Sequence, residues 1–285
     1  MFRITGLALA FSVLSVTAAT TYEITPALPE TGFPHEFDAD ILGLSVGMTA
    51  DDALAALKDR FPAMHFNNIR TYAFPQTDVT FTGSFSNHPL PVANGSSESF
   101  RVRASSPASG NQVYVVHRHV IFPREEPPTI ASIMSSLVGK YGPPSSVDGN
   151  GSWIWAFRDG ERLGMHEDAA AHVVADPGQI QERIKDLPQD VQLGLNPLIS
   201  CATHAAIWNV PTDNRLGNTR NQPCDAYLYV KILEDRTHKG RAVNMTIAVA
   251  DLKRRLSSAV IDNNALAEAE AERQGRVAAS GAPEL

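Results

Sequence analysis

Two parts of the chain alternate apolar and polar residues in short runs. The first part holds TDVTFTGSF, SFRVRASS and QVYVVHRHVIF, between residues 64 and 122. The second holds DAYLYVKIL and AVNMTIAVA on either side of EDRTHKGR. Because side chains alternate between the two faces of a strand, each run predicts a strand with one apolar face. The turn residues between the runs predict antiparallel hairpins, one of them across residues 107–111.

Two other segments have helical spacing. Apolar residues at Leu54, Leu57 and Phe61 share one face of a helix that should run from Ala50 to about Phe61, with Thr49 as its N-cap. The second segment predicts a helix over 130–141, ended by Gly-Pro-Pro. Its apolar residues recur with helical spacing: Ile130, Ile133, Met134, Leu137, Val138 and Tyr141.

Each half of the chain therefore has an amphipathic helix followed by antiparallel strands. This order predicts an α+β fold in which amphipathic helices pack on an antiparallel sheet, arranged as two helix-plus-hairpin lobes. Whether the lobes share one sheet stays open. The expected organisation is a signal peptide at 1–19, an extended lead-in at 20–37, a first lobe at 38–125, a second lobe at 126–262 with an insertion near 177–196, and a C-terminal helix and disordered tail at 263–285.

The first residues have the pattern of a secretory signal. Arg3 precedes an apolar run from Leu7 to Val16, and small residues follow at Ala18 and Ala19. The run is too short to span a bilayer, which needs about 20 residues. No cysteine follows it to accept a lipid. We therefore expect a cleaved signal, no membrane span after cleavage, and a periplasmic or secreted protein.

The charge of the chain argues against nucleic acid as a partner. The 285 residues carry a net charge of −7, and removal of Arg3 with the signal makes the charge about −8. Binding to phosphates is driven by clustered Lys and Arg. The longest basic clusters, at 253–255 and 238–241, are short, and we interpret them as solvated faces or turns.

The two cysteines are Cys201 and Cys224. In an exported chain an even pair predicts a disulfide, which in the chain-entropy description stabilises a fold by roughly 3 kcal/mol. The alternative is a metal site made of Cys201, His204 and Cys224. It lacks a fourth ligand at regular spacing and suits a reducing compartment better.

Residues 43–47 read Gly-Leu-Ser-Val-Gly and match the G-x-S-x-G pattern of a hydrolase nucleophile elbow. The sequence before Ser45 is charged, and it is too short to hold the strands that precede such an elbow. The helix cap also falls four residues late, at Thr49. We therefore interpret Ser45 as part of a turn that feeds a helix, and no catalytic residue or cofactor is predicted.

His117 and His119 would lie on the same face of a strand, at a spacing suited to a metal. A third ligand could come from His65, His166 or Glu167. The H-x-H spacing is common by chance, so a metal here is a minor hypothesis.

Trp153 and Trp155 alternate along a predicted strand and would share one of its sides. Exposed, they would make a contact surface for a sugar. Such a stripe is more often part of a core.

Two segments resemble the small SmpA/OmlA-type (BamE-like) envelope domain, whose architecture the β-lactamase inhibitor proteins share. The first is LGLSVGMTADDALAALKDRF, where a Gly-Met-Thr turn caps a helix. The second is SSLVGKYGPPSSVDGNGSWIWAF, where a helix ends in Gly-x-Pro and an aromatic strand follows. The matching residues are Gly47, Met48, Thr49, Ala53, Leu57, Gly142, Pro144, Trp153 and Trp155.

This chain lacks the lipid-anchoring cysteine of that family, and its two matching segments lie further apart than one small module needs. The resemblance implies a protein-binding module of the bacterial envelope. We therefore expect an exported, non-enzymatic binding protein whose partner is an envelope protein. The alternative is an exported hydrolase that uses Ser45 or a histidine-bound metal.

Overall fold

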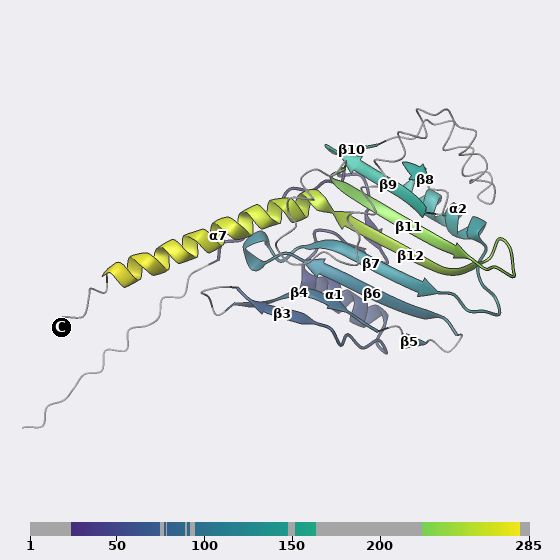
Figure 1. The fold of residues 1–285 in the computed structure, drawn as a ribbon, viewed down its shortest axis with the longest axis horizontal. Coiled ribbons are helices and arrows are strands. Elements are labelled where there is room, and N and C mark those ends of the chain that lie inside the picture. Colours follow the sequence, from purple (N-terminus) through teal and green to yellow (C-terminus); the bar gives the residue numbers. More distant parts are fainter. Residues whose placement is uncertain are drawn as a thin grey trace, which may run out of the picture.

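Figure 1 shows the protein in a computed structural model that describes residues 24–279, apart from 75–76, 78, 89, 92–94, 148–151 and 164–223. The elements in chain order are β1 (Asp40–Ile41), β2 (Leu44–Ser45), α1 (Ala50–Arg60), β3 (Arg70–Ala73), β4 (Thr80–Ser86), β5 (Leu90–Pro91), β6 (Ser97–Ala104), the short 3₁₀ helix η1 (Pro107–Ser109), β7 (Val113–Ile121), α2 (Ile130–Tyr141), β8 (Ser146–Val147), β9 (Ser152–Arg158), β10 (Glu161–Arg162), β11 (Ala226–Glu234), β12 (Ala242–Asp251) and α7 (Leu252–Ala279).

Most of the strands form one large antiparallel sheet. Its order is β10-β9-β11-β12-β7-β6-β4-β3, while β5 pairs with β6 and β8 with β9. The strands β1 and β2 form a separate small pair. The expected α+β class is confirmed, and so are the predicted hairpins β6–β7 and β11–β12.

The two halves of the chain contribute to the same sheet. In the first half α1 precedes the consecutive neighbours β4, β6 and β7, and in the second α2 precedes β9, β11 and β12. The last strand of each half lies at the centre, where His117 of β7 pairs with Ala248 of β12. The question that the sequence left open is therefore settled: strands from 38–125 and 126–262 share one sheet.

Both α1 and α2 lie on the same face of this sheet, behind it in the view of Figure 1. They bury their apolar sides against inward side chains of both halves of the sheet. The buried helix residues are Ala50, Ala53, Leu54, Leu57, Met134, Leu137 and Tyr141. Inward sheet residues include Phe85, Phe100, Val102, Trp153, Trp155, Leu228, Val230, Ile247 and Val249. One core thus joins the two halves.

The predicted helix boundaries at 50–61 and 130–141 are confirmed to within a residue. The Thr49 hydroxyl accepts a 3.1 Å hydrogen bond from the Asp52 N–H, and Thr129 accepts one of 3.1 Å from the Ser132 N–H. Each cap satisfies a backbone donor that the first turn leaves without a helical partner. Gly142 ends α2 with φ of 73°, a conformation that glycine adopts at low cost.

The described part of the lead-in has no helix or strand from residue 24, turns where the Phe37 N–H donates to the Pro34 carbonyl, and is held against the sheet. The Ala27 N–H donates to the Ala108 carbonyl at 2.8 Å, and the Gly32 N–H donates to Asp251 Oδ1 at 3.0 Å. A Cβ on Gly32 would lie 2.6 Å from the Asp225 carbonyl oxygen. Only glycine fits this close approach of two backbones.

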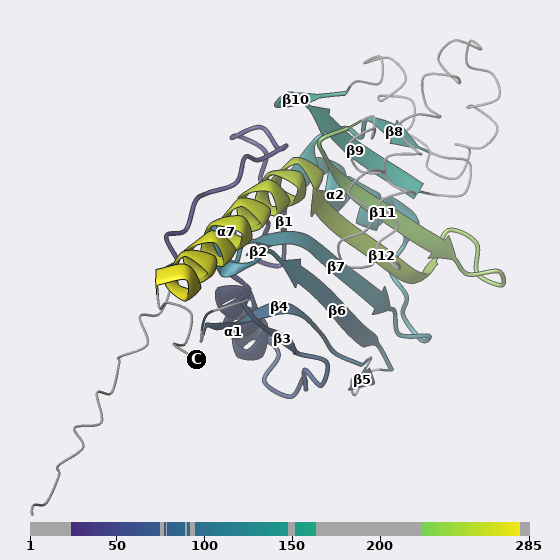
Figure 2. The same ribbon diagram turned by 60° about the vertical axis from the view of Figure 1, so that its left-hand side comes forward.

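The C-terminal helix begins earlier than predicted, since α7 starts at Leu252 directly after β12 rather than near residue 263. Asp251 explains the difference. Its Oδ1 accepts the Arg254 N–H at 2.8 Å and so caps the helix. The basic residues 253–255, interpreted as a solvated face or turn, form its first turn. Figures 1 and 2 show that α7 extends well beyond the sheet. The predicted disordered tail is helical to Ala279, and residues 280–285 lie outside the described part.

Asp262 fastens α7 to the β6–β7 hairpin. Its Oδ1 accepts hydrogen bonds from the hydroxyls of Ser106 and Ser109, at 2.7 and 2.6 Å. Burial raises the pKa of the Asp262 carboxyl despite these donors. The first half of the helix is thereby tied to the sheet. The insertion expected near 177–196 and the signal peptide at 1–19 lie outside the described residues.

Candidate functional site

The second face of the large sheet, opposite α1 and α2, gathers basic side chains at its centre. Strand alternation and register place five of them there, from β6, β7 and β11: Arg101, Arg103, His117, His119 and Lys231. We call this set the cationic face. No acidic residue occupies an outward position of β6, β7, β12 or β11 between these side chains in the described strands. These outward positions thus hold a local excess of basic residue types, although the chain as a whole is acidic.

The register sets the side chains in rows that cross the strands. One row runs from Arg101 through His117 to Ala248 and Tyr229. The next runs from Ser99 through His119 to Thr246, Lys231 and Ser152. His119 Nδ1 lies 3.0 Å from the Thr246 hydroxyl. Neighbouring strands are about 4.8 Å apart, so the members of a row are within reach of a single ligand.

Like charges within the face act on one another. Burial, and then the nearby Arg103, lower the pKa of Arg101. Burial lowers the pKa of His117 to about 4, with smaller contributions from Arg101 and His119. Burial also lowers the pKa of His119. His117 is therefore neutral at pH 7, chiefly because its side chain is buried.

An apolar patch adjoins the cationic face at the end where α7 begins. Ile154, Ala156, Tyr227 and Ala250 are fully buried there. The Tyr227 hydroxyl is buried without a hydrogen-bond partner among the described residues. Burial, and then the neighbouring Tyr229, raise the pKa of this phenol. The second face is therefore covered at this end, where its basic centre adjoins a second buried cluster.

The histidines proposed as metal ligands do lie two residues apart on the same face of β7. In the described part of the chain, however, no three His, Cys, Asp or Glu side chains come together to hold a metal ion. His65 lies in the loop before β3, and His166 and Glu167 are outside the described residues. The two imidazoles are instead neighbours of arginine and threonine.

Trp153 and Trp155 share one side of β9 as predicted, but that side faces the helices. They are 2% and 0% exposed, so neither offers a contact surface to a sugar. The Trp155 Nε1–H donates to the Gly142 carbonyl at 2.8 Å, and its ring lies 5.9 Å from that of Tyr141. They are core residues, which is the interpretation that the sequence favoured, and the alternative of an exposed contact surface is wrong.

Ser45 lies in the two-residue strand β2, which pairs with β1. Its backbone N–H donates to Met48 Sδ at 3.3 Å, and α1 begins only at Ala50. A nucleophile elbow needs the serine on a sharp turn directly between strand and helix. This local geometry supports the interpretation of 43–47 as a turn that leads to the α1 cap.

Cys224 is 3% exposed and lies just before β11. Cys201, with which a disulfide is predicted, lies outside the described residues, as does His204 of the alternative metal site. The bond between Cys201 and Cys224 stays a prediction.

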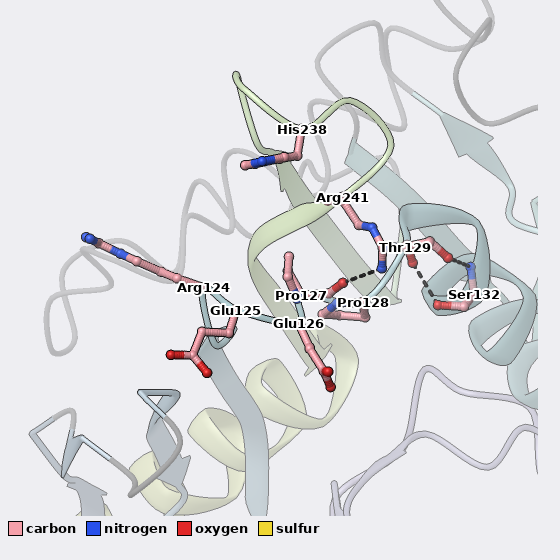
Figure 3. Close-up of a pocket in the computed structure, with 9 residues that line it drawn as sticks. All are labelled: Arg124, Glu125, Glu126, Pro127, Pro128, Thr129, Ser132, His238 and Arg241. Atoms are coloured by element: carbon pink, nitrogen blue, oxygen red, sulfur yellow. Dashed lines mark hydrogen bonds between the residues drawn. The ribbon is translucent and has the colours of Figure 1, made fainter.

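A shallow hollow of about 640 Å³ lies where the β7–α2 connection meets the β11–β12 turn (Figure 3). The Arg241 guanidinium donates to the Pro127 carbonyl at 2.8 Å, and the N–H and hydroxyl of Ser132 donate to the hydroxyl and carbonyl of Thr129. Arg124 and Glu126 point in different directions in Figure 3. Because its polar groups do not converge, the hollow is a weaker candidate than the cationic face.

Arg101, Arg103 and Lys231 were not predicted as site residues from the sequence. The signal was present, since SFRVRASS alternates arginine with apolar residues. The sequence did not show that the arginines of β6 lie beside the histidines of β7, on the face of the sheet that neither α1 nor α2 covers.

Comparison with family models, with curated proteins and with solved structures finds no match to this chain. Among the described residues, no helix combines the length and the apolar character needed to cross a bilayer.

Proposed function

We propose that this chain is an exported, non-enzymatic binding protein of the bacterial envelope, and that it contacts an envelope protein through the cationic face. The observation that carries the proposal is the concentration of Arg101, Arg103, His117, His119 and Lys231 on one face of a sheet whose other face is buried under α1 and α2.

The contrast between this face and the rest of the chain supports a specific contact. A protein of net charge −7 repels other polyanions at long range, so it is poorly suited to nucleic acid. A local basic patch on such a protein attracts a partner that presents a limited acidic surface. The rigid sheet holds the patch in one geometry.

Two features of the sequence support the envelope as the location. Residues 1–19 have the pattern of a cleaved signal, and the segments around Gly47 and Trp153 resemble an envelope binding module. Export is tested by mass spectrometry of the periplasmic fraction of the host. A chain that begins near residue 19 or 20 is expected there, and a full-length cytoplasmic chain would contradict export.

The contact is tested by photo-cross-linking in intact cells. A photoreactive amino acid is placed at Ser99 or Asn244, at outward positions of β6 and β12, and in a control at Ser135, which is exposed on α2. We expect one envelope protein to be joined at both sheet positions and not at Ser135.

A second experiment uses the double variant R101Q/R103Q with the photoreactive residue at Ser99. Loss of the cross-link in this variant would show that the contact depends on the two arginine charges. An adduct of equal yield at Ser135, or an adduct that the double variant does not weaken, would contradict the proposal.

A further inference from the structure

We infer that residues 164–223 pack on the second face of the sheet, as a layer over β9, β11 and β12 at the end of the face next to α7. This inference goes beyond the proposed function and does not depend on it. It assigns an occupant from within the chain to the apolar patch around Tyr227.

The burial of Tyr227 carries the inference. In β11 this residue pairs with Ala156 of β9 on one side and with Ala250 of β12 on the other. Side chains stand roughly perpendicular to a sheet, so a tyrosine ring reaches well beyond the methyl groups of two neighbouring alanines. Tyr227 is nevertheless 0% exposed. Other atoms must therefore lie over its ring.

The described members of the surrounding cluster do not supply this layer. Apart from Leu252, which begins α7, they belong to the strands of the sheet or to the residues on either side of 164–223. The helix α7 packs on η1 and β7, and Figures 1 and 2 show that it leads away from the sheet. The layer over Tyr227 therefore comes from outside the described elements.

Both ends of the segment lie beside this patch. Before it, the Leu163 N–H donates to the Ala156 carbonyl at 2.9 Å, and after it the Asp225 N–H donates to the Phe157 carbonyl at 2.7 Å. Cys224 is buried in the same cluster. The chain thus leaves and rejoins the sheet at β9, with 60 residues between the two points. The distance from β9 to β7 is about 15 Å, which about ten residues of helix span, so the segment is long enough.

Burial along the strands shows how far the layer extends. Next to the row of Tyr227, Ile154 and Ala248 are also 0% exposed. One row further, Lys231 is half-buried, and at the far end Ile121 and Leu233 are 38% and 45% exposed. The face therefore changes along the strands from closed near α7 to open at the opposite end.

The sequence of the segment suits this surface. Residues 191–212 contain no Asp, Glu, Lys or Arg, so they can pack on an apolar patch. Cys201 lies within this run, and the predicted bond to Cys224 would bring the run to the cluster. The whole segment holds seven acidic residues against four basic ones, which complements the excess of basic residue types at the centre of the face.

The test is photo-cross-linking within the purified protein. A diazirine analogue of lysine replaces Lys231, which lies at the margin of the covered area, and in a matched control it replaces Lys58, which is exposed on α1. Mass spectrometry after digestion identifies the joined peptides. We expect the probe at Lys231 to join peptides from 164–223 and the probe at Lys58 to join none of them. A mixture of isotope-labelled and unlabelled protein separates contacts within one chain from contacts between two.

Hydroxyl-radical labelling gives an independent measurement at Tyr227. Tyr72, which is 39% exposed on β3, is the internal control. A fully buried ring reacts only when the structure opens, so native Tyr227 should be oxidised about tenfold more slowly than Tyr72. The two rates should become equal in urea.

Three results would overturn the inference. They are cross-links from Lys231 that omit 164–223, cross-links that join it only to a second copy of the chain, and oxidation of Tyr227 as fast as that of Tyr72. The proposed envelope contact is judged separately, because Ser99 and Asn244 lie toward the open end of the face. A partner can be captured there whether or not 164–223 covers Tyr227.

Discussion

The Thr31 hydroxyl donates a 2.7 Å hydrogen bond to Oδ2 of Asp251, a residue that is 220 positions away in the sequence. The same carboxylate accepts from the Gly32 N–H and from the backbone and side chain of Arg254. One buried carboxylate therefore holds together the lead-in, the end of β12 and the start of α7.

Replacement of Asp251 by alanine should destabilise the protein by about 3 kcal/mol. Asp251 is fully buried, and its loss removes the carboxylate that pairs with the Arg254 guanidinium. The measurement is the free energy of unfolding in urea. E125A, at an exposed loop residue, is the control and should change it little. A loss equal to that of the control would show that the carboxylate does not anchor the three segments.

His117 should make stability depend on pH. Its pKa is about 4 in the folded protein against an ordinary value of 6.5, so the unfolded chain takes up the proton first as pH falls. The free energy of unfolding should therefore fall between pH 6.5 and about 4, by up to about 3 kcal/mol, with the full stability present above 6.5.

Urea unfolding of the parent and of H117Q at several pH values tests this dependence. The free energy of unfolding of H117Q should change less with pH between 6.5 and about 4. H238Q serves as the control, because the His238 side chain is 73% exposed. Identical slopes in the parent and H117Q would exclude His117 as the cause.

Trp153 and Trp155 should be shielded from water. In a W208F background, which removes the third tryptophan, the native emission should lie at short wavelength and resist quenching by iodide, because the two rings are 2% and 0% exposed. Unfolding in urea should restore quenching to the level of free tryptophan amide. Strong quenching of the native protein would contradict the burial of these rings under α2.

The protein should contain no free thiol. Cys224 is buried at 3% exposure, and a bond to Cys201 would hide both sulfurs from a thiol reagent even after unfolding. Thiol titration of the unfolded, unreduced protein should give none, and reduction should release two. Two reactive thiols before reduction would refute the disulfide.

Local patterns were sufficient for the two amphipathic helices and the long strands, but the short strands β1, β2, β3, β5, β8 and β10 were not predicted. The helix over 130–141, its end at Gly142 and the hairpins β6–β7 and β11–β12 follow from residue spacing and turn chemistry, which act within a few residues. The start of α7 was missed, because the cap at Asp251 follows a strand without any intervening turn residue.

The sequence by itself determined the α+β class, the caps and the inward or outward alternation along each strand, since these depend on neighbours in the chain. Only the tertiary structure decided which face of the sheet α1 and α2 cover. Alternation groups Arg101 with Arg103, and Trp153 with Trp155, but it does not say which strands bring their side chains to the same face of one sheet. The pairing of β7 with β12 joins the two halves in one sheet, and the burial of apolar area under both helices leaves the basic residues on the other face.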